Sequence, residues 1–250
     1  MATKTVMIMV YLRTFFEFLI VILAMIVFMP LGVLAFLIHI IGLKKLSAIF
    51  IYKMAQCWAM LLIIGSGCTM KVTGRENIPK TGGVCFVSNH TGLLDIPLLL
   101  AYTGRPFGFI AKKELSFIPF LNMWILLLGG LFIDRKNPRK ALKTISKGVK
   151  HIKSGSAMII FPEGHRSRGQ GLLPFRPGAF KLAVRSGAAL IPVSISGGYE
   201  VFEKQRAITP GPVSITFGTP VFASEFENID AKQNLSDKIY GIIDEMLKKQ

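Results

Sequence analysis

The chain has 250 residues, enough for one large domain or for one domain with an appendage. Hydrophobic residues make up 51% of the chain, and its formal net charge is +16. A soluble protein is rarely both this apolar and this basic, and a nucleic-acid-binding protein needs no long apolar N-terminus. The composition therefore favours an anionic membrane surface as a partner and argues against nucleic acid.

The segment from residue 15 to residue 43 is almost wholly apolar, and Pro30 divides it in two. A membrane span needs about 20 apolar residues, so the whole segment exceeds one span while each half falls short. Two geometries fit: one kinked transmembrane helix, or a helix–turn–helix hairpin immersed in one leaflet. Arg13 and Lys44 lie at the two ends, and a hairpin brings both ends to the same side, beside the basic domain, which favours the hairpin.

Residues 46–64 form a second apolar segment, which Lys53 and Gln56 interrupt. Two interpretations stay open: a helix shared between protein and lipid, with Tyr52 and Trp58 at headgroup level, or an ordinary core helix. We expect residues 1–64 to form the membrane anchor and first packing helix, and residues 65–250 to form the catalytic domain.

Beyond residue 70, short apolar runs alternate with amphipathic segments, and this alternation indicates an α/β domain. Expected strands are 84–88, 107–111, 131–134, 157–161, 190–194 and 213–217, and expected helices are 94–101, 118–128, 138–153, 178–186 and 234–247.

His90 and Asp95 lie where the first of these strands passes into its helix. Ligands bind at such strand ends in open α/β sheets. Five positions separate the two residues, so they share no helix face, but a histidine on the preceding loop can fold back onto the aspartate. The pair would then form the base and orienter of a triad without a protein nucleophile. A purely structural histidine, capped by a helix-start carboxylate, is the alternative.

Three further strand ends carry cations: Lys112, Arg135 and Arg166. Arginine suits bidentate phosphate binding, so a basic cluster beside a histidine base predicts a phosphorylated substrate with a free hydroxyl. Each cation alone is more often an ordinary surface charge. Glu163, between Pro162 and a glycine, would orient the cations, accept from a substrate hydroxyl, or serve only as an ion-pair partner.

Other enzyme classes lack their motifs in this sequence. There is no G-x-S-x-G nucleophile elbow, no complete P-loop, no G-x-G-x-x-G and no H-E-x-x-H. Cys57, Cys68 and Cys85 lie in or beside apolar runs without metal-ligand spacing, so we expect buried thiols, no disulfide and no metal site.

Four ordered stretches resemble the glycerolipid acyltransferase family, most closely the bacterial lysophosphatidate acyltransferases of the PlsC type. They are Asn-His-Thr-Gly-Leu-Leu-Asp at 89–95, Gly129–Arg135 ending in Phe-Ile-Asp-Arg, Phe-Pro-Glu-Gly-His-Arg-Ser at 161–167, and Ile-Pro-Val at 191–193. The resemblance covers about residues 70–200 and implies a mixed α/β sheet flanked by helices. It departs at His165, where the family usually has threonine.

The resemblance implies acyl transfer from acyl-CoA or acyl-carrier protein to the 2-hydroxyl of lysophosphatidic acid, giving phosphatidic acid. His90 would be the general base and Asp95 its orienter. The acceptor phosphate would be held by Arg135, Glu163, Gly164 and Arg166, with Lys112 assisting. No cofactor is implied, and the enzyme would work at the cytoplasmic face of the inner membrane.

Two rival functions stay open. One is a related acyltransferase that uses glycerol-3-phosphate or another lysolipid as acceptor. The other is a non-catalytic membrane-binding protein of the same fold, against which the intact His90 and Asp95 pair argues.

Overall fold

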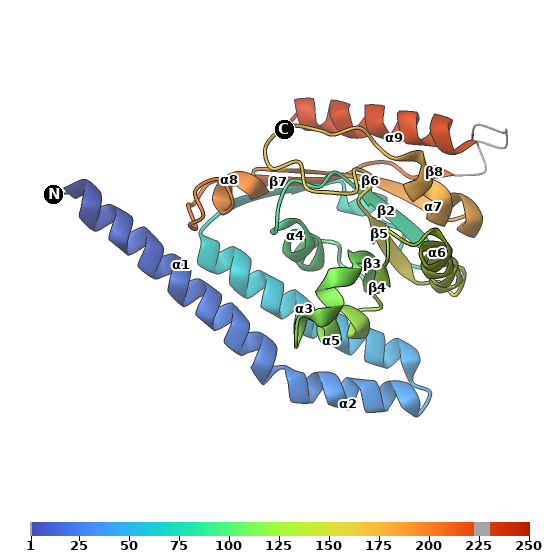
Figure 1. Ribbon diagram of the computed structural model, residues 1–250, viewed down its shortest axis with the longest axis horizontal. Helices are drawn as coiled ribbons and strands as arrows, with labels where there is room; N and C mark the ends of the chain where they lie inside the picture. Colours follow the sequence, from blue (N-terminus) through green and yellow to red (C-terminus); the bar gives the residue numbers. More distant parts are fainter. Residues whose placement is uncertain (1, 223–230) are drawn as a thin grey trace.

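The computed structural model describes residues 2–222 and 231–250, and a mixed eight-stranded sheet with helices on both faces organises this part of the chain (Figure 1). The strand order is β1-β7-β6-β2-β5-β3-β4, and β8 pairs with β6. The pairs of β6 with β7 and with β8 are antiparallel, and the other pairs are parallel. The mixed α/β class is confirmed.

The elements follow the predicted alternation closely. The strands are β1 Thr69–Thr73, β2 Val84–Ser88, β3 Phe107–Lys112, β4 Leu131–Ile133, β5 Ala157–Ile160, β6 Ala189–Ser196, β7 Pro212–Phe217 and β8 Val221–Phe222. The helices are α1 Ala2–Val27, α2 Met29–Ile40, α3 Lys44–Ser66, α4 Asp95–Tyr102, α5 Leu121–Leu127, α6 Pro138–Lys153, α7 Lys181–Ser186, α8 Gly198–Val201 and α9 Ala231–Lys248.

The N-terminal helices form a hairpin, but not within residues 15–43 as the sequence favours: α1 and α2 follow one another through a bend, which is the alternative geometry, and α3 completes the hairpin. Pro30 sits at the start of α2, where a missing N–H costs nothing, so α2 continues from α1 after a bend. The chain reverses at Gly42, whose φ of 95° suits glycine, and α3 then runs back along α2 and α1 (Figure 1). One limb of the hairpin is therefore α1 with α2, and the other is α3.

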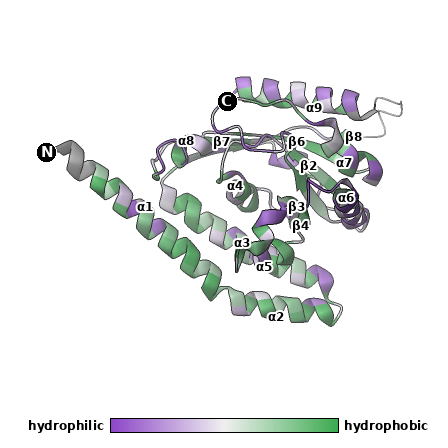
Figure 2. Cartoon of the chain, in the orientation of Figure 1, coloured by the Kyte–Doolittle hydropathy of each residue, from purple (hydrophilic) through white to green (hydrophobic). Residues whose placement is uncertain are grey.

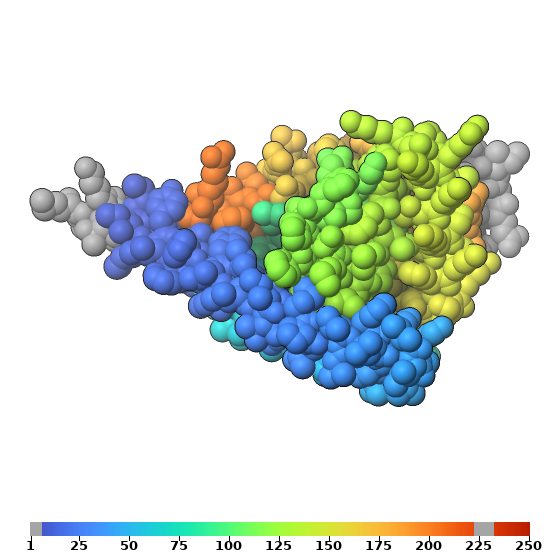
Figure 3. All heavy atoms as spheres, turned by 60° about the horizontal axis from the view of Figure 1, so that its bottom comes forward, coloured from blue at the N-terminus to red at the C-terminus, as the bar shows by residue number. Residues whose placement is uncertain are grey.

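The outer surface of α1 and α2 is apolar over most of its length (Figure 2). Large hydrophobic side chains such as Phe15, Phe16 and Leu37 are more than half exposed there. Phe117 and Leu126 extend the exposed apolar surface toward α5, which adjoins the N-terminal helices in Figure 3. Within the described chain, Met7–Ile40 and Lys44–Ser66 are long and apolar enough to cross a membrane.

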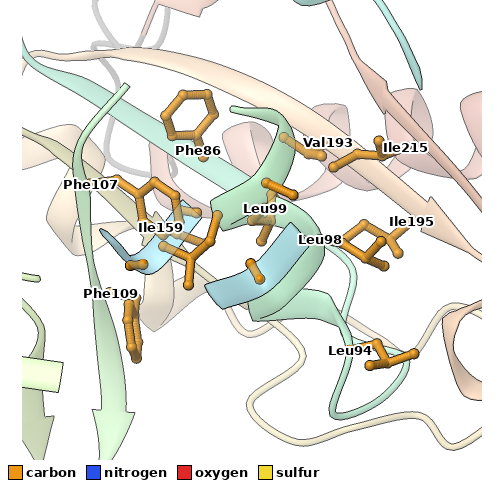
Figure 4. Packing of buried hydrophobic residues seen from close by; sticks show 14 of the residues in the cluster. Phe86, Leu94, Leu98, Leu99, Phe107, Phe109, Ile159, Val193, Ile195 and Ile215 are labelled. Atoms are coloured by element: carbon orange, nitrogen blue, oxygen red, sulfur yellow. The ribbon is translucent and has the colours of Figure 1, made fainter. Parts of the chain in front are cut away.

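Both faces of the central sheet are buried, which explains the continuous apolar runs in its strands. In β2, Val84 and Phe86 pack under α3 and α4, whereas Cys85 and Val87 pack under α6, α7 and α9. Leu98 and Leu99 of α4 lie against the strands in Figure 4. This packing fixes α4, and with it Asp95, over the sheet.

Tyr52, Gln56 and Trp58 of α3 bind backbone groups of the protein. The Tyr52 hydroxyl, 2% exposed as a residue, donates to Leu100 O at 3.0 Å and accepts from Gly104 N at 2.9 Å. Trp58 Nε1 donates to Val21 O at 3.0 Å. The headgroup interpretation of Tyr52 and Trp58 is therefore wrong. The expectation of three buried thiols was also too broad, because Cys57 of α3 is exposed.

The loop of residues 202–209 joins α1 to the sheet. Phe202 packs on Phe18 with ring centroids 4.9 Å apart, and Ile208 N donates to Thr14 Oγ1 at 2.8 Å. Arg13 donates to Gly65 O at 2.6 Å beside this contact. The contacts couple α1 to both α3 and this loop.

We predict that Tyr52→Phe lowers the free energy of unfolding by about 1–3 kcal/mol, because it leaves the Leu100 carbonyl and the Gly104 amide unsatisfied in the core. Denaturant unfolding in detergent micelles measures the change. Tyr11→Phe is the matched control, since Tyr11 is 51% exposed. Equal stability of the Tyr52→Phe variant and the control would contradict the prediction.

Candidate active site

Four neighbouring strands deliver the candidate site residues to one edge of the sheet. β2, β5, β3 and β4 lie side by side and parallel, so their carboxyl ends point the same way. His90 follows β2, Glu163 and Arg166 follow β5, Lys112 ends β3 and Arg135 follows β4. The edge is the one at which open α/β sheets bind ligands.

His90 and Asp95 are in direct contact. Nδ1 of His90 lies 2.7 Å from Oδ2 of Asp95. The Asp95 side chain is 0% exposed, whereas the His90 side chain is 22% exposed. Because an ionised carboxylate only accepts, this contact places the proton on Nδ1 and leaves Nε2 as an acceptor. The predicted base-and-orienter geometry is present.

Asp95 also builds the turn that carries His90. Its carboxylate accepts from Thr91 N at 2.7 Å, Gly92 N at 3.0 Å and Thr91 Oγ1 at 2.8 Å. It stands in the first turn of α4, where the helix dipole favours negative charge. Four hydrogen bonds thus compensate the burial of this carboxylate. The alternative interpretation, a helix-start carboxylate that caps the turn, also describes Asp95.

Asn89 fixes the histidine loop to the next strand. Its Nδ2 donates to Ile195 O and its Oδ1 accepts from Ile195 N, both at 2.8 Å. The side chain thereby extends the ladder between β2 and β6 by one rung. No local pattern in the sequence indicates this pairing, because the β6 partner is more than 100 positions away.

Glu163 faces the protein interior and supports the histidine loop. It is 1% exposed, and its Oε1 accepts from His90 N at 2.6 Å while its Oε2 accepts from Leu173 N at 3.2 Å. Burial, with a smaller contribution from the charge of Asp95, raises the pKa of Glu163 to about 7. Both oxygens of Glu163 accept from backbone amides. The sequence predicts that Glu163 contacts the substrate or the cations, and no cation is its partner in the part of the chain that the structure describes.

The loop after β5 lies against the loop after β2. Ser167 N donates to His90 O at 2.8 Å, and Arg168 N donates to Thr91 O at 3.2 Å. The ring of Phe161 stacks on the His90 ring with centroids 4.1 Å apart. These contacts hold one ring face and both flanking peptides of His90, so its Nε2 edge has a fixed direction.

Arginines surround this pair of loops. Arg135 Nη1 donates to the carbonyl of Gly164, and Arg166 Nη1 donates to Glu203 Oε1 at 2.7 Å. Arg176 lies close enough to Gly164 to contact a side chain there. Partial burial, together with the charge of Arg176, lowers the pKa of the Arg135 guanidinium. Arg135 and Arg176 are thus like-charged neighbours, and an anion bound beside them would be stabilised by both.

Lys112 and His165 stand at the margin of the site. Lys112 is 62% exposed, and its Nζ lies 3.5 Å from Glu114 Oε1. His165 is exposed, with Nδ1 lying 3.3 Å from Glu163 O. Hydrogen bonds therefore join His90 to Asp95 and Glu163, and Arg135 to Gly164. Arg166 is linked to the turn after His90 only through Glu203, and Lys112 stands apart from all of them.

Sequence reasoning missed two charged residues of the site. Arg176 follows Pro174-Phe175, and Glu203 lies beyond β6, outside every strand-end motif. Only the contact of each with the loop after β5 reveals its role. In the described part of the chain, no group of three or more histidine, cysteine, aspartate or glutamate residues could hold a metal ion.

A sequence model of the family described as Acyltransferase matches residues 69–196, just over half of the chain. The chain belongs to the acyltransferase family. It is 35% identical to the 1-acyl-sn-glycerol-3-phosphate acyltransferase of Borreliella burgdorferi over 147 residues, and these aligned residues make up 58% of each chain. It is 41% identical over 116 residues to that of Escherichia coli, 46% of this chain and 47% of the relative. These alignments span about half to three fifths of the relatives' lengths.

A solved structure, the 1-acyl-sn-glycerophosphate (LPA) acyltransferase PlsC from Thermotoga maritima, is similar over nearly the whole chain. The TM-score is 0.83 at 27% sequence identity, covering 95% of this acyltransferase and 94% of that chain. The similarity includes the N-terminal helices as well as the sheet, because it extends far beyond the matched family region.

The raised pKa of Glu163 predicts a pH-dependent loss of stability. The native carboxyl keeps its proton up to pH about 7, whereas the unfolded one loses it near pH 4.5. The native state thus binds more protons between these values, so stability falls as pH rises through this window and then levels off.

Glu163→Gln removes this titration. We expect the wild type to lose about 2–3 kcal/mol relative to Glu163→Gln between pH 4.5 and pH 7.5. Unfolding midpoints of both proteins across this range, in one detergent, measure the difference. Parallel pH curves would contradict the prediction.

Proposed function

We propose that this acyltransferase transfers an acyl chain from a thioester to the 2-hydroxyl of 1-acyl-sn-glycerol-3-phosphate, giving phosphatidic acid. The contact that carries the proposal is the 2.7 Å pair of His90 and Asp95 at a sheet edge bordered by arginines. The relatives from Borreliella burgdorferi and Escherichia coli are 1-acyl-sn-glycerol-3-phosphate acyltransferases, which supports the same acceptor.

His90 acts as the general base. Its Nε2 takes the proton of the acceptor hydroxyl as the oxygen attacks the thioester carbonyl carbon. The tetrahedral intermediate then collapses, the carbon–sulfur bond breaks, and the imidazolium returns the proton to the leaving thiolate. Asp95 holds the ring orientation and stabilises the transient imidazolium. Glu163 contributes by fixing the His90 backbone.

Arg135 and Arg166 bind the acceptor phosphate. Each uses one guanidinium nitrogen for the protein, on Gly164 O and Glu203 respectively, and retains further N–H donors for a phosphate. Gly164 has a φ of 81°, which favours glycine, and its lack of a side chain leaves room for the Arg176 guanidinium beside its backbone. Lys112, at the end of β3, adds positive charge at the margin.

An apolar cavity next to the site suits an acyl chain. It lies between α1, α3, α4, α5 and β3, and its lining includes Trp58, Leu100, Phe109 and Trp124. Ile96 and Leu100 of α4 belong to its lining, and Ile96 directly follows Asp95 in the chain. In the proposed complex the acyl chain occupies this cavity and its thioester end faces the His90 loop.

Membrane placement follows from the exposed apolar surface of the hairpin. The hairpin enters the lipid, and the net charge of +16 favours an anionic leaflet. We assign the catalytic part to the cytoplasmic side of the inner membrane, where soluble acyl-CoA or acyl-carrier protein reaches the site. No cofactor takes part.

The decisive experiment is thiol release by the purified protein in mixed micelles. We expect release from acyl-CoA with lysophosphatidic acid and much less with glycerol-3-phosphate or other lysolipids, because these lack either the anchoring chain or the exposed phosphate. Equal release without any acceptor would contradict acyl transfer, and a preference for another acceptor would replace the proposed one.

We predict that His90→Ala lowers kcat about 10²–10⁴-fold, the usual contribution of a general base. Asp95→Asn should lower it too, because an amide nitrogen replaces one accepting oxygen. His151→Gln, on α6, is the matched control. Circular dichroism establishes retained folding, and wild-type activity in a folded His90→Ala protein would exclude this mechanism.

Arg135→Ala is expected to raise KM for lysophosphatidic acid about tenfold with little change in KM for acyl-CoA, because one charge-assisted contact is lost. Arg139→Ala is the control, since Arg139 is exposed in the first turn of α6. An equal rise for both substrates would argue against phosphate binding by Arg135.

A further inference from the structure

Glu203 joins two parts of the site that come from different strands. Its Oε1 accepts from Arg166 Nη1 at 2.7 Å, and its Oε2 accepts from Leu93 N at 2.5 Å. Leu93 belongs to the turn after His90, and Arg166 belongs to the loop after β5. One carboxylate thus ties the histidine turn to an arginine of the phosphate site.

The environment of this carboxylate strengthens the contact. The side chains of Arg166 and Glu203 are 27% and 14% exposed, so solvent screens the pair less than a surface ion pair. A side chain at Gly92 would approach Glu203 Oε2 to 2.4 Å, so the turn is shaped around this oxygen. Glycine at position 92 gives the carboxylate its access to Leu93 N.

Arg166 alone has no fixed direction, because its side chain has several rotatable bonds. Binding of Nη1 by Glu203 orients the planar guanidinium, and its remaining N–H donors then have one direction. The loop that carries Glu203 is itself fixed: Phe202 packs on Phe18, and Ile208 N bonds Thr14 Oγ1. Glu203 is therefore held from outside the site.

We propose that Glu203 is a positioning residue for the acceptor phosphate, which directs Arg166 toward the lipid headgroup and holds the turn after His90. The proposal rests on the function proposed above and adds a residue outside the four family-like blocks. Glu203 touches no reacting atom, and it acts through Arg166 and Leu93.

Glu203→Gln tests the proposal, since glutamine keeps an accepting oxygen for Leu93 N but loses the charge that holds Arg166. We expect KM for lysophosphatidic acid to rise about tenfold, with KM for acyl-CoA changed less than about twofold. Glu203→Asp keeps the charge on a shorter side chain and should recover part of the loss. Glu200→Gln, an exposed carboxylate of α8, is the control.

A double-mutant cycle separates positioning from general support of the fold. In an Arg166→Ala background, Glu203→Gln should change KM for lysophosphatidic acid less than about twofold, because the group it directs is already absent. If the two substitutions raised KM for lysophosphatidic acid independently, so that their factors multiplied in the double mutant, the proposal would be overturned. An unchanged KM in Glu203→Gln, or an equal rise in KM for both substrates, would overturn it too. If Glu203→Gln does not fold, Glu203→Asp enters the same cycle: its smaller rise in KM for lysophosphatidic acid should vanish in the Arg166→Ala background, and a rise of equal size in both backgrounds overturns the proposal.

The wild-type assay distinguishes a failure of the proposed function from a failure of the Glu203 role. Absence of transfer to lysophosphatidic acid by the wild type overturns the proposed function and the Glu203 role together. Transfer by the wild type, with Glu203→Gln indistinguishable from it, overturns the Glu203 role alone.

Discussion

The site depends on one buried carboxylate at the start of a helix. Asp95 is fully buried, and it collects an imidazole N–H, two backbone amides and a hydroxyl. Burying a charge without such partners would cost several kcal/mol, so the turn around it must keep this shape. The same carboxylate therefore stabilises the turn and orients the His90 ring.

A second carboxylate, Glu163, plays the same part from the neighbouring strand. It binds the His90 amide, while Ser167 N binds the His90 carbonyl. The histidine peptide is thus held at both polar groups by the loop after β5. Glu163 and Glu203 both bind backbone amides of the histidine turn, so two carboxylates near the site serve the scaffold, which explains why so polar a site can be rigid.

Much of this architecture could be predicted from local pattern. The buried strands are continuous apolar runs, α6 begins at an Asn137–Pro138 cap, and the spacing of His90 and Asp95 indicates their contact. What could not be predicted depends on distant partners. Asn89 pairs with Ile195, and Glu203 reaches Leu93, and neither pairing leaves a local periodicity. The position of the hairpin turn could not be predicted either. Pro30 suggests a reversal, but a proline in the first turn of a helix does not interrupt it, and the chain reverses only at Gly42.

The loop of residues 202–209 has a consequence for dissecting this acyltransferase. On one side it packs on Phe18 and Thr14 of α1, and on the other it presents Glu203 to the site. The apolar first helix therefore also supports the loop that carries Glu203. A shortened protein lacking α1 would lose this support together with an exposed apolar surface, so its inactivity would report a displaced Glu203 loop as much as a loss of lipid binding.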